Sequence, residues 1–175
     1  MQVRTSIAAT IASLAVALVA LLGAPGVTQA QAEPPPDLRL DVHGDFGWYH
    51  SFGAGVRFDI PIVRDGFTRS SSVKDDLSIS PGVELFSAYG PYSGMGVIPM
   101  VMVQWNLYFA HKFSFFLEAG IAMLLAPSGW SHHYYDNVIA PVGQLGFRWH
   151  FSDAMALLIR VGWPAGTQIG IAFDL

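Results

Sequence analysis

The chain has no cysteine among its 175 residues, and only 13% of its residues are charged. The lack of cysteine excludes disulfide bonds, and it also excludes a lipid anchor attached to a cysteine. Soluble proteins usually carry about 25% charged residues, so the sequence has too little charge for an ordinary water-exposed surface. The formal net charge is −4, and no cluster of basic residues is present to neutralise phosphates, so we expect no nucleic-acid partner.

Long apolar runs are also missing beyond the N-terminal region. The longest uncharged stretch there, 86–110, is interrupted by three glycines and two prolines. A membrane-spanning helix needs about 20 consecutive apolar residues. This part of the chain is therefore not a helical membrane protein.

The N-terminal region has the layout of a secretory signal peptide. Arg4 supplies a positive charge, an uncharged apolar run follows over 7–22, and Ala30-Gln31-Ala32 offers a cleavage site. The run is short for a spanning helix. We predict a signal peptide over 1–32, a proline-rich leader over 33–37 and one folded domain over 38–175.

Residues 38–49 alternate apolar and polar side chains almost without a break, as a β-strand with two different faces does. Leu38, Leu40 and Val42 share one face, while Arg39 and Asp41 share the other. The same pattern predicts eight strands, at 38–49, 52–63, 77–87, 97–109, 113–125, 138–151, 154–163 and 167–175.

The alternation alone fits either a soluble barrel, with the apolar face inside, or a transmembrane barrel, with that face in lipid. The low charge, the even strand number and the mixture of short turns and longer loops favour the second. The expected fold is all-β, an eight-stranded antiparallel up-and-down transmembrane β-barrel. Most glycines then face inward, where they leave room for long polar side chains: Gly47, Gly53, Gly55, Gly82, Gly120, Gly146, Gly162 and Gly170.

The predicted inward face carries nearly balanced charges. Buried charges are costly unless they are paired, and an eight-stranded barrel is just wide enough for side chains to fill it. We therefore expect an ion-pair network that plugs the lumen, formed by Arg39, Asp41, Asp45, Arg57, Asp59, Glu84, Glu118, Arg148 and Arg160.

No motif points to catalysis, a cofactor or a metal. His43 and His150 are expected to be luminal histidines with satisfied hydrogen bonds, since no spacing of His, Asp and Glu is typical of a metal site. Glu84 and Glu118 are the residue types of a catalytic acid–base pair, but nothing in their spacing places them on opposite sides of a cleft. The loop 127–136 is the richest polar and aromatic cluster, and its candidates for outer-loop interactions are Trp130, His132, His133, Tyr134 and Tyr135.

Three segments carry a family resemblance: 55–63 (GVRFDIPIV), 104–108 (QWNLY) and 160–164 (RVGWP). With them, the chain from 38 to 175 resembles the small OmpA/OmpX-type outer-membrane barrels, and more narrowly an uncharacterised group of Gram-negative outer-membrane β-barrel proteins. The resemblance implies insertion by the barrel-assembly machinery and no particular activity.

The expected function is that of a monomeric outer-membrane barrel of a Gram-negative bacterium, in contact with outer-membrane lipid. We expect it to have a structural role or to interact with partners through its outer loops, and we do not expect it to be an enzyme. Two alternatives stay open: a narrow channel or porin for ions or small solutes, and a lipid A-modifying enzyme. Ser131, His132 and Asp136 supply residue types for the enzyme but no recognisable motif.

Overall fold

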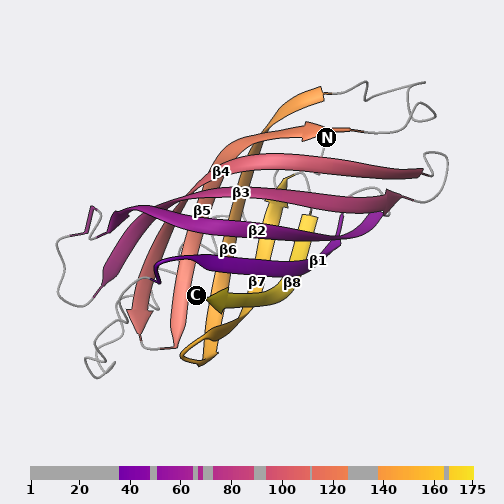
Figure 1. Cartoon of the computed structure of the whole chain (residues 1–175). Coiled ribbons are helices and arrows are strands. Elements are labelled where there is room, and N and C mark those ends of the chain that lie inside the picture. Colours follow the sequence, from indigo (N-terminus) through magenta and orange to yellow (C-terminus); the bar gives the residue numbers. More distant parts are fainter. Residues whose placement is uncertain are drawn as a thin grey trace, which may run out of the picture. The chain divides into compact units, whose positions relative to one another are not determined.

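The computed structural model describes residues 36–47, 51–64, 67–68, 73–88, 94–110, 112–125, 138–163 and 166–175. They form eight strands that follow one another along the chain (Figure 1). The strands are β1 (Arg39–Phe46), β2 (Ser51–Arg64), β3 (Lys74–Ala88), β4 (Gly94–Ala110), β5 (Phe113–Leu124), β6 (Val138–Ser152), β7 (Met155–Trp163) and β8 (Gly166–Asp174).

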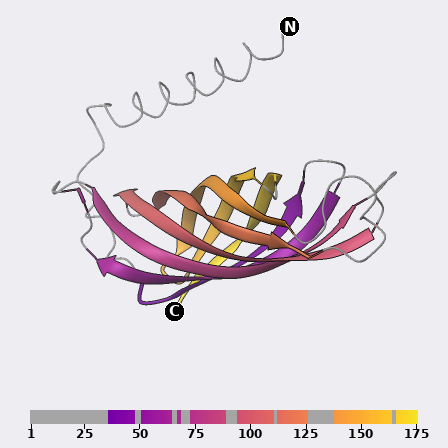
Figure 2. The same ribbon diagram turned by 90° about the horizontal axis from the view of Figure 1, so that it is seen from above.

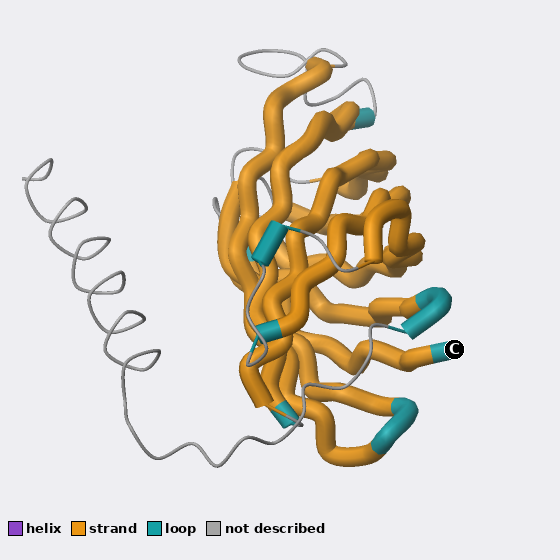
Figure 3. Tube along the Cα trace, turned by 90° about the vertical axis from the view of Figure 1, so that its left-hand side faces the viewer, coloured by secondary structure: helices purple, strands orange, loops and turns teal. Residues whose placement is uncertain are grey.

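The strands form one closed antiparallel barrel in chain order. Each pairs with the next, and β1 also pairs with β8, so that Val42 lies between Val56 of β2 and Ile171 of β8. The ribbon curves round through all eight strands (Figure 2), and strands joined by turns make up the described part of the chain (Figure 3). Among the described residues, no helix is long and apolar enough to cross a membrane. The predicted all-β, eight-stranded antiparallel fold is confirmed.

The barrel has two ends that differ in their connections. The terminal end holds the start of β1, the end of β8 and the connections 65–73, 111–112 and 153–154. The loop end holds the connections 47–50, 89–93, 125–137 and 164–165. The predicted signal peptide and most of the predicted 33–37 leader lie outside the described residues, but Asp37 is described and pairs with Arg64 at the end of β2.

Side chains alternate between a buried inward face and an exposed outward face along every strand. On β1, Arg39, Asp41 and His43 are buried, while Val42 is 43% exposed and Phe46 63% exposed. Large apolar side chains are exposed on the outer face of all eight strands. The barrel is therefore polar inside and apolar outside over much of its surface, the reverse of a soluble protein.

The sequence pattern suggests a polar lumen, but part of the lumen in the structure is apolar. Ile98, Met100 and Met102 of β4 pack with Ala122 and Val142 as a buried apolar cluster. These residues belong to the halves of β4, β5 and β6 that lie toward the loop end. The sequence pattern missed the cluster because β4 is apolar on both faces there, and only the closed barrel shows which of those side chains point inward.

The β2–β3 connection is shorter than the predicted 64–76, because β3 begins at Lys74 and not at 77. Asp75, in the added part of the strand, is buried and hydrogen-bonded. Asp75 accepts hydrogen bonds from the backbone N–H of Phe67 (2.7 Å) and from Trp105 Nε1 (2.9 Å). The Phe67 and Trp105 rings also meet edge to face, with centroids 6.4 Å apart. Part of this connection is thus held against the outer surface of the barrel.

The inward position of the glycines can be tested on β6, which has one glycine on each face. A Cβ on Gly146 would lie 2.6 Å and 2.7 Å from ring carbons of Phe116, whereas a Cβ on Gly143 would meet nothing within 4 Å. We expect Gly146→Ala to lower the free energy of unfolding by about 1–3 kcal/mol through overpacking. Gly143→Ala should change it much less. Urea unfolding in detergent micelles measures both, and equal losses would contradict the assigned faces.

Candidate functional site

The centre of the lumen contains a continuous chain of ion pairs, here called the ion-pair chain. It runs from one partner to the next through Glu84, Arg57, Glu118, Arg160, Asp41, Arg148 and Asp59. These residues come from β1, β2, β3, β5, β6 and β7, and each is at most 4% exposed. Seven of the nine charged residues that the sequence analysis places in the lumen therefore meet in one cluster.

The ion pairs in this chain are short and bridge different sides of the barrel. Arg57 contacts Glu84 at 2.5 Å and Glu118 at 3.0 Å. Arg160 contacts the same Glu118 oxygen at 3.1 Å and Asp41 at 2.9 Å. Arg148 completes the chain at 3.3 Å from Asp41 and 2.6 Å from Asp59. Because each arginine joins two carboxylates, the strands are cross-linked through the lumen as well as round the wall.

Neutral polar side chains fill further bonding positions around the ion pairs. Gln144 Oε1 accepts from Arg57 at 2.8 Å, and Gln168 Oε1 accepts from Arg160 at 3.0 Å. Asp59 also accepts from Ser80 Oγ (2.6 Å) and from Gln104 Nε2 (3.1 Å). Such supporting donors and acceptors help a buried charge network to offset the cost of removing its charges from water.

Phe116 is a luminal residue to which the sequence analysis assigns no role. Its ring is 0% exposed, and the guanidinium carbons of Arg148 and Arg160 lie 4.1 Å and 5.1 Å from its centroid. Both distances are within the range of cation–π attraction. The period of two along β5, which places Ser114 and Glu118 inward, also places Phe116 inward and would have been enough to find it.

Arg39, one of the two remaining predicted network residues, lies apart from the ion-pair chain. Arg39 pairs with Asp174 of β8 at 2.5 Å, and His150 Nδ1 lies 3.6 Å from the same carboxylate. Arg39 and Asp174 are the first residue of β1 and the last of β8. This second cluster therefore joins the two ends of the chain where the barrel closes, a pairing that no local sequence pattern could reveal.

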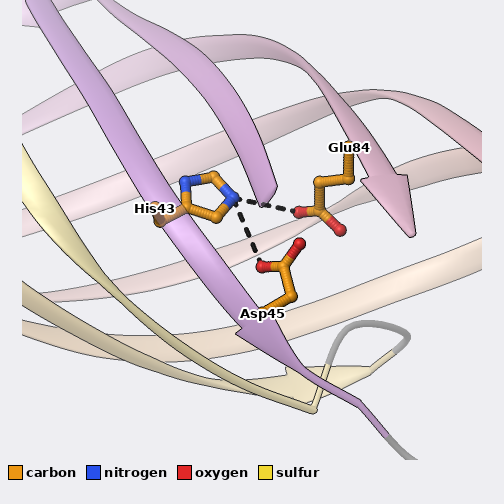
Figure 4. A group of neighbouring side chains, drawn as sticks. All are labelled: His43, Asp45 and Glu84. Carbon is orange, nitrogen blue, oxygen red and sulfur yellow. Dashed lines mark ion pairs between the residues drawn. The ribbon is translucent and has the colours of Figure 1, made fainter. Parts of the chain in front are cut away.

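Asp45, the ninth predicted residue, lies in a third group with His43 and Glu84 (Figure 4). His43 Nε2 lies 3.6 Å from Asp45 Oδ1 and 3.5 Å from Glu84 Oε1. Among the described residues, neither ring nitrogen of His43 and neither carboxylate oxygen of Asp45 has a hydrogen-bond partner. His43 is therefore luminal, as expected, but its ring nitrogens lack the expected hydrogen bonds, and its polar neighbours are two carboxylates at ion-pair distance.

His150 is the other luminal histidine, and its surroundings differ. Its Nε2 lies 3.3 Å from Ser114 Oγ, and a single carboxylate, that of Asp174, faces its other ring nitrogen. Glu84 and Glu118, considered in the sequence as an acid–base pair, are instead joined through Arg57. The outer-loop candidates, Trp130, His132, His133, Tyr134 and Tyr135, lie outside the described residues, as do Ser131 and Asp136.

Comparison with known proteins supports the fold. No protein-family model matches the chain, and no curated protein sequence matches it. One similar solved structure comes from work on the de novo design of transmembrane β-barrels. It is 17% identical, covers 82% of this chain and 99% of its own, and has a TM-score of 0.50. The barrel architecture is thus shared with a transmembrane barrel, while the predicted OmpA/OmpX-type resemblance stays a prediction.

Proposed function

We propose that this protein is an outer-membrane β-barrel with a closed lumen, exported after removal of residues 1–32. Its role is structural, or interaction through the connections at the loop end, with the 126–137 loop as the principal contact. The observation that carries the proposal is the reversed distribution of side chains. Arginines and carboxylates are buried inside, while apolar side chains of all eight strands are exposed outside.

The exposed apolar surface supports a lipid environment. Monomeric soluble proteins rarely expose contiguous apolar patches larger than a few hundred Å². Here Phe58, Ile60, Val103 and Ile159 are all more than 40% exposed on the outer face. They come from three different strands, so exposed apolar side chains are not confined to one side of the barrel. Strands of about 9–11 residues suffice to cross a bilayer, and β3 and β4, with 15 and 17 residues, exceed this length.

The ion-pair chain favours a closed barrel over the alternative of a narrow channel. An ion passing through the lumen would have to displace Arg57, Arg148 and Arg160 from carboxylates that they contact directly. Breaking a buried pair leaves an uncompensated charge, which costs about 3–5 kcal/mol. We therefore propose that the lumen is a structural plug and not a selectivity filter.

The membrane and closed-lumen parts of this proposal can be tested together. The mature chain should need detergent or lipid to fold, and the folded form should migrate faster than the boiled form in a gel. In planar bilayers the folded protein should show no discrete conductance steps. Steps that change when Arg57 or Arg160 is neutralised would establish the channel instead. A mature chain that folds in buffer without detergent would overturn the membrane location.

A further inference from the structure

We infer that His43, Asp45 and Glu84 form a binding site for one divalent transition-metal ion of the zinc class, inside the barrel near its loop end. The three side chains offer one nitrogen and two carboxylate ligands that all lie within 4.8 Å of one another (Figure 4). A ligand set that includes an imidazole nitrogen suits zinc and related ions better than calcium or magnesium, which prefer oxygen alone.

The distances in this group suit a shared cation better than direct hydrogen bonds. His43 Nε2 is 3.5 Å and 3.6 Å from the two carboxylate oxygens, whereas hydrogen bonds from nitrogen to oxygen are about 2.7–3.2 Å long. Ligands bound to zinc at about 2.0–2.2 Å in tetrahedral geometry lie about 3.3–3.6 Å apart. Both distances from His43 match this range, and the ligand atoms all lie within 4.8 Å of one another, so a small movement of the side chains would let all three bind one ion.

The unpartnered polar atoms are an independent indication of a ligand. Asp45 is 5% exposed and His43 is 3% exposed, yet among the described residues neither Asp45 oxygen and neither His43 ring nitrogen has a partner at hydrogen-bond geometry. The buried carboxylates of the ion-pair chain all contact an arginine. A buried carboxylate without a partner is costly, and a cation at this point would provide one.

The surrounding strands are arranged so that the three ligands can meet. Gly55 of β2 lies opposite His43 on one side and opposite Glu84 on the other. A Cβ at Gly55 would lie 2.6 Å from His43 Nε2 and 2.7 Å from Glu84 Cγ, so any larger residue would separate the ligands. Arg57 and Gln168 hold Glu84 in place at 2.5 Å and 2.6 Å. Both donate to Oε1, the oxygen that also faces His43, so a small rotation of the carboxylate would present Oε2 to the ion.

The group lies close to the loop end of the barrel. Asp45 is the penultimate residue of β1, and its neighbours Gly53 and Gln168 are each the third residue of their strands, counted from the loop end. The ligands therefore lie just inside the rim of the barrel. The apolar luminal cluster belongs to β4, β5 and β6, on strands other than those of His43 and Asp45.

Zinc titration of the folded protein tests the site. The protein, purified in detergent, is dialysed against Zn²⁺, and bound metal is counted per chain. His132 and His133 are replaced by glutamine in every sample, because that histidine pair is a separate source of zinc binding. We expect one tightly bound ion per barrel, and the urea midpoint of unfolding should rise when Zn²⁺ is added.

Substitutions assign the ion to this group. Asp45→Asn and His43→Gln should each weaken zinc binding by at least about 10–100-fold and remove the zinc-dependent rise in the urea midpoint. His150→Gln is the matched control: it removes the other luminal histidine, which faces one carboxylate, and should leave binding unchanged. Gel mobility verifies that each variant is folded, and Asp45→Asn suffices if His43→Gln fails to fold. Absence of saturable binding, or equal binding by Asp45→Asn, would overturn the inference without affecting the proposed function.

Discussion

Replacement of Arg148 by methionine is expected to lower the free energy of unfolding by about 3–5 kcal/mol. Arg148 contacts Asp59 at 2.6 Å and Asp41 at 3.3 Å, donates to Asn106 Oδ1 at 2.8 Å, and lies over the Phe116 ring. Methionine fills a similar volume but leaves Asp59 without its arginine inside the barrel. The loss of one partner from a buried pair therefore costs more than the pair itself contributes.

The double variant Arg148→Met, Asp59→Asn separates these two effects. With both charges removed, no buried charge is left uncompensated at this position, and Asp41 keeps its contact with Arg160 at 2.9 Å. Most of the lost stability should return. Arg64→Met is the matched control: its ion pair with Asp37 is exposed, so it should change stability by less than about 1 kcal/mol. Urea unfolding in lipid vesicles measures all three. A double variant as unstable as Arg148→Met would contradict an ion-pair role for Arg148.

Ile159→Arg should lower the free energy of unfolding in a bilayer by about 2–4 kcal/mol. Ile159 is 41% exposed in the middle of β7, and its neighbours across the sheet, Phe147 and Ile169, are also exposed and apolar. An arginine at this position would lie in the hydrocarbon near the midplane. The measurement is urea unfolding of the protein in lipid vesicles.

The depth dependence of this effect distinguishes lipid from water. Ile139 is 63% exposed and is the second residue of β6 at the loop end, so Ile139→Arg lies near or beyond the membrane surface and should cost about 0–1 kcal/mol. Equal effects of the two substitutions would mean that no hydrocarbon surrounds Ile159. In that case the exposed apolar surface would need a different explanation.

Local pattern predicts much of this barrel because strand side chains alternate between two faces. The segment 38–49 already separates Arg39, Asp41 and Asp45 from Val42 and Phe46, and the structure keeps that separation. The same alternation predicts eight strands and places Gly146 on the inward face, as the structure shows. It fails at Lys74 and Asp75, which lie before the predicted strand 77–87 but belong to β3, where hydrogen bonds from Phe67 and Trp105 satisfy Asp75 on the barrel wall.

Alternation along the chain predicts the strand number, the two faces of most strands and nine of the charges that are buried in the lumen. Which of these charges meet follows from the closed barrel and not from any single strand. Arg39 pairs with Asp174 because β1 and β8 close the barrel, and Asp45 lies beside His43 and Glu84 because Gly55 leaves space between them. The physical reason is that alternation is a local property of each strand. Pairing across the lumen depends on the register of all eight strands and on the curvature that closes them.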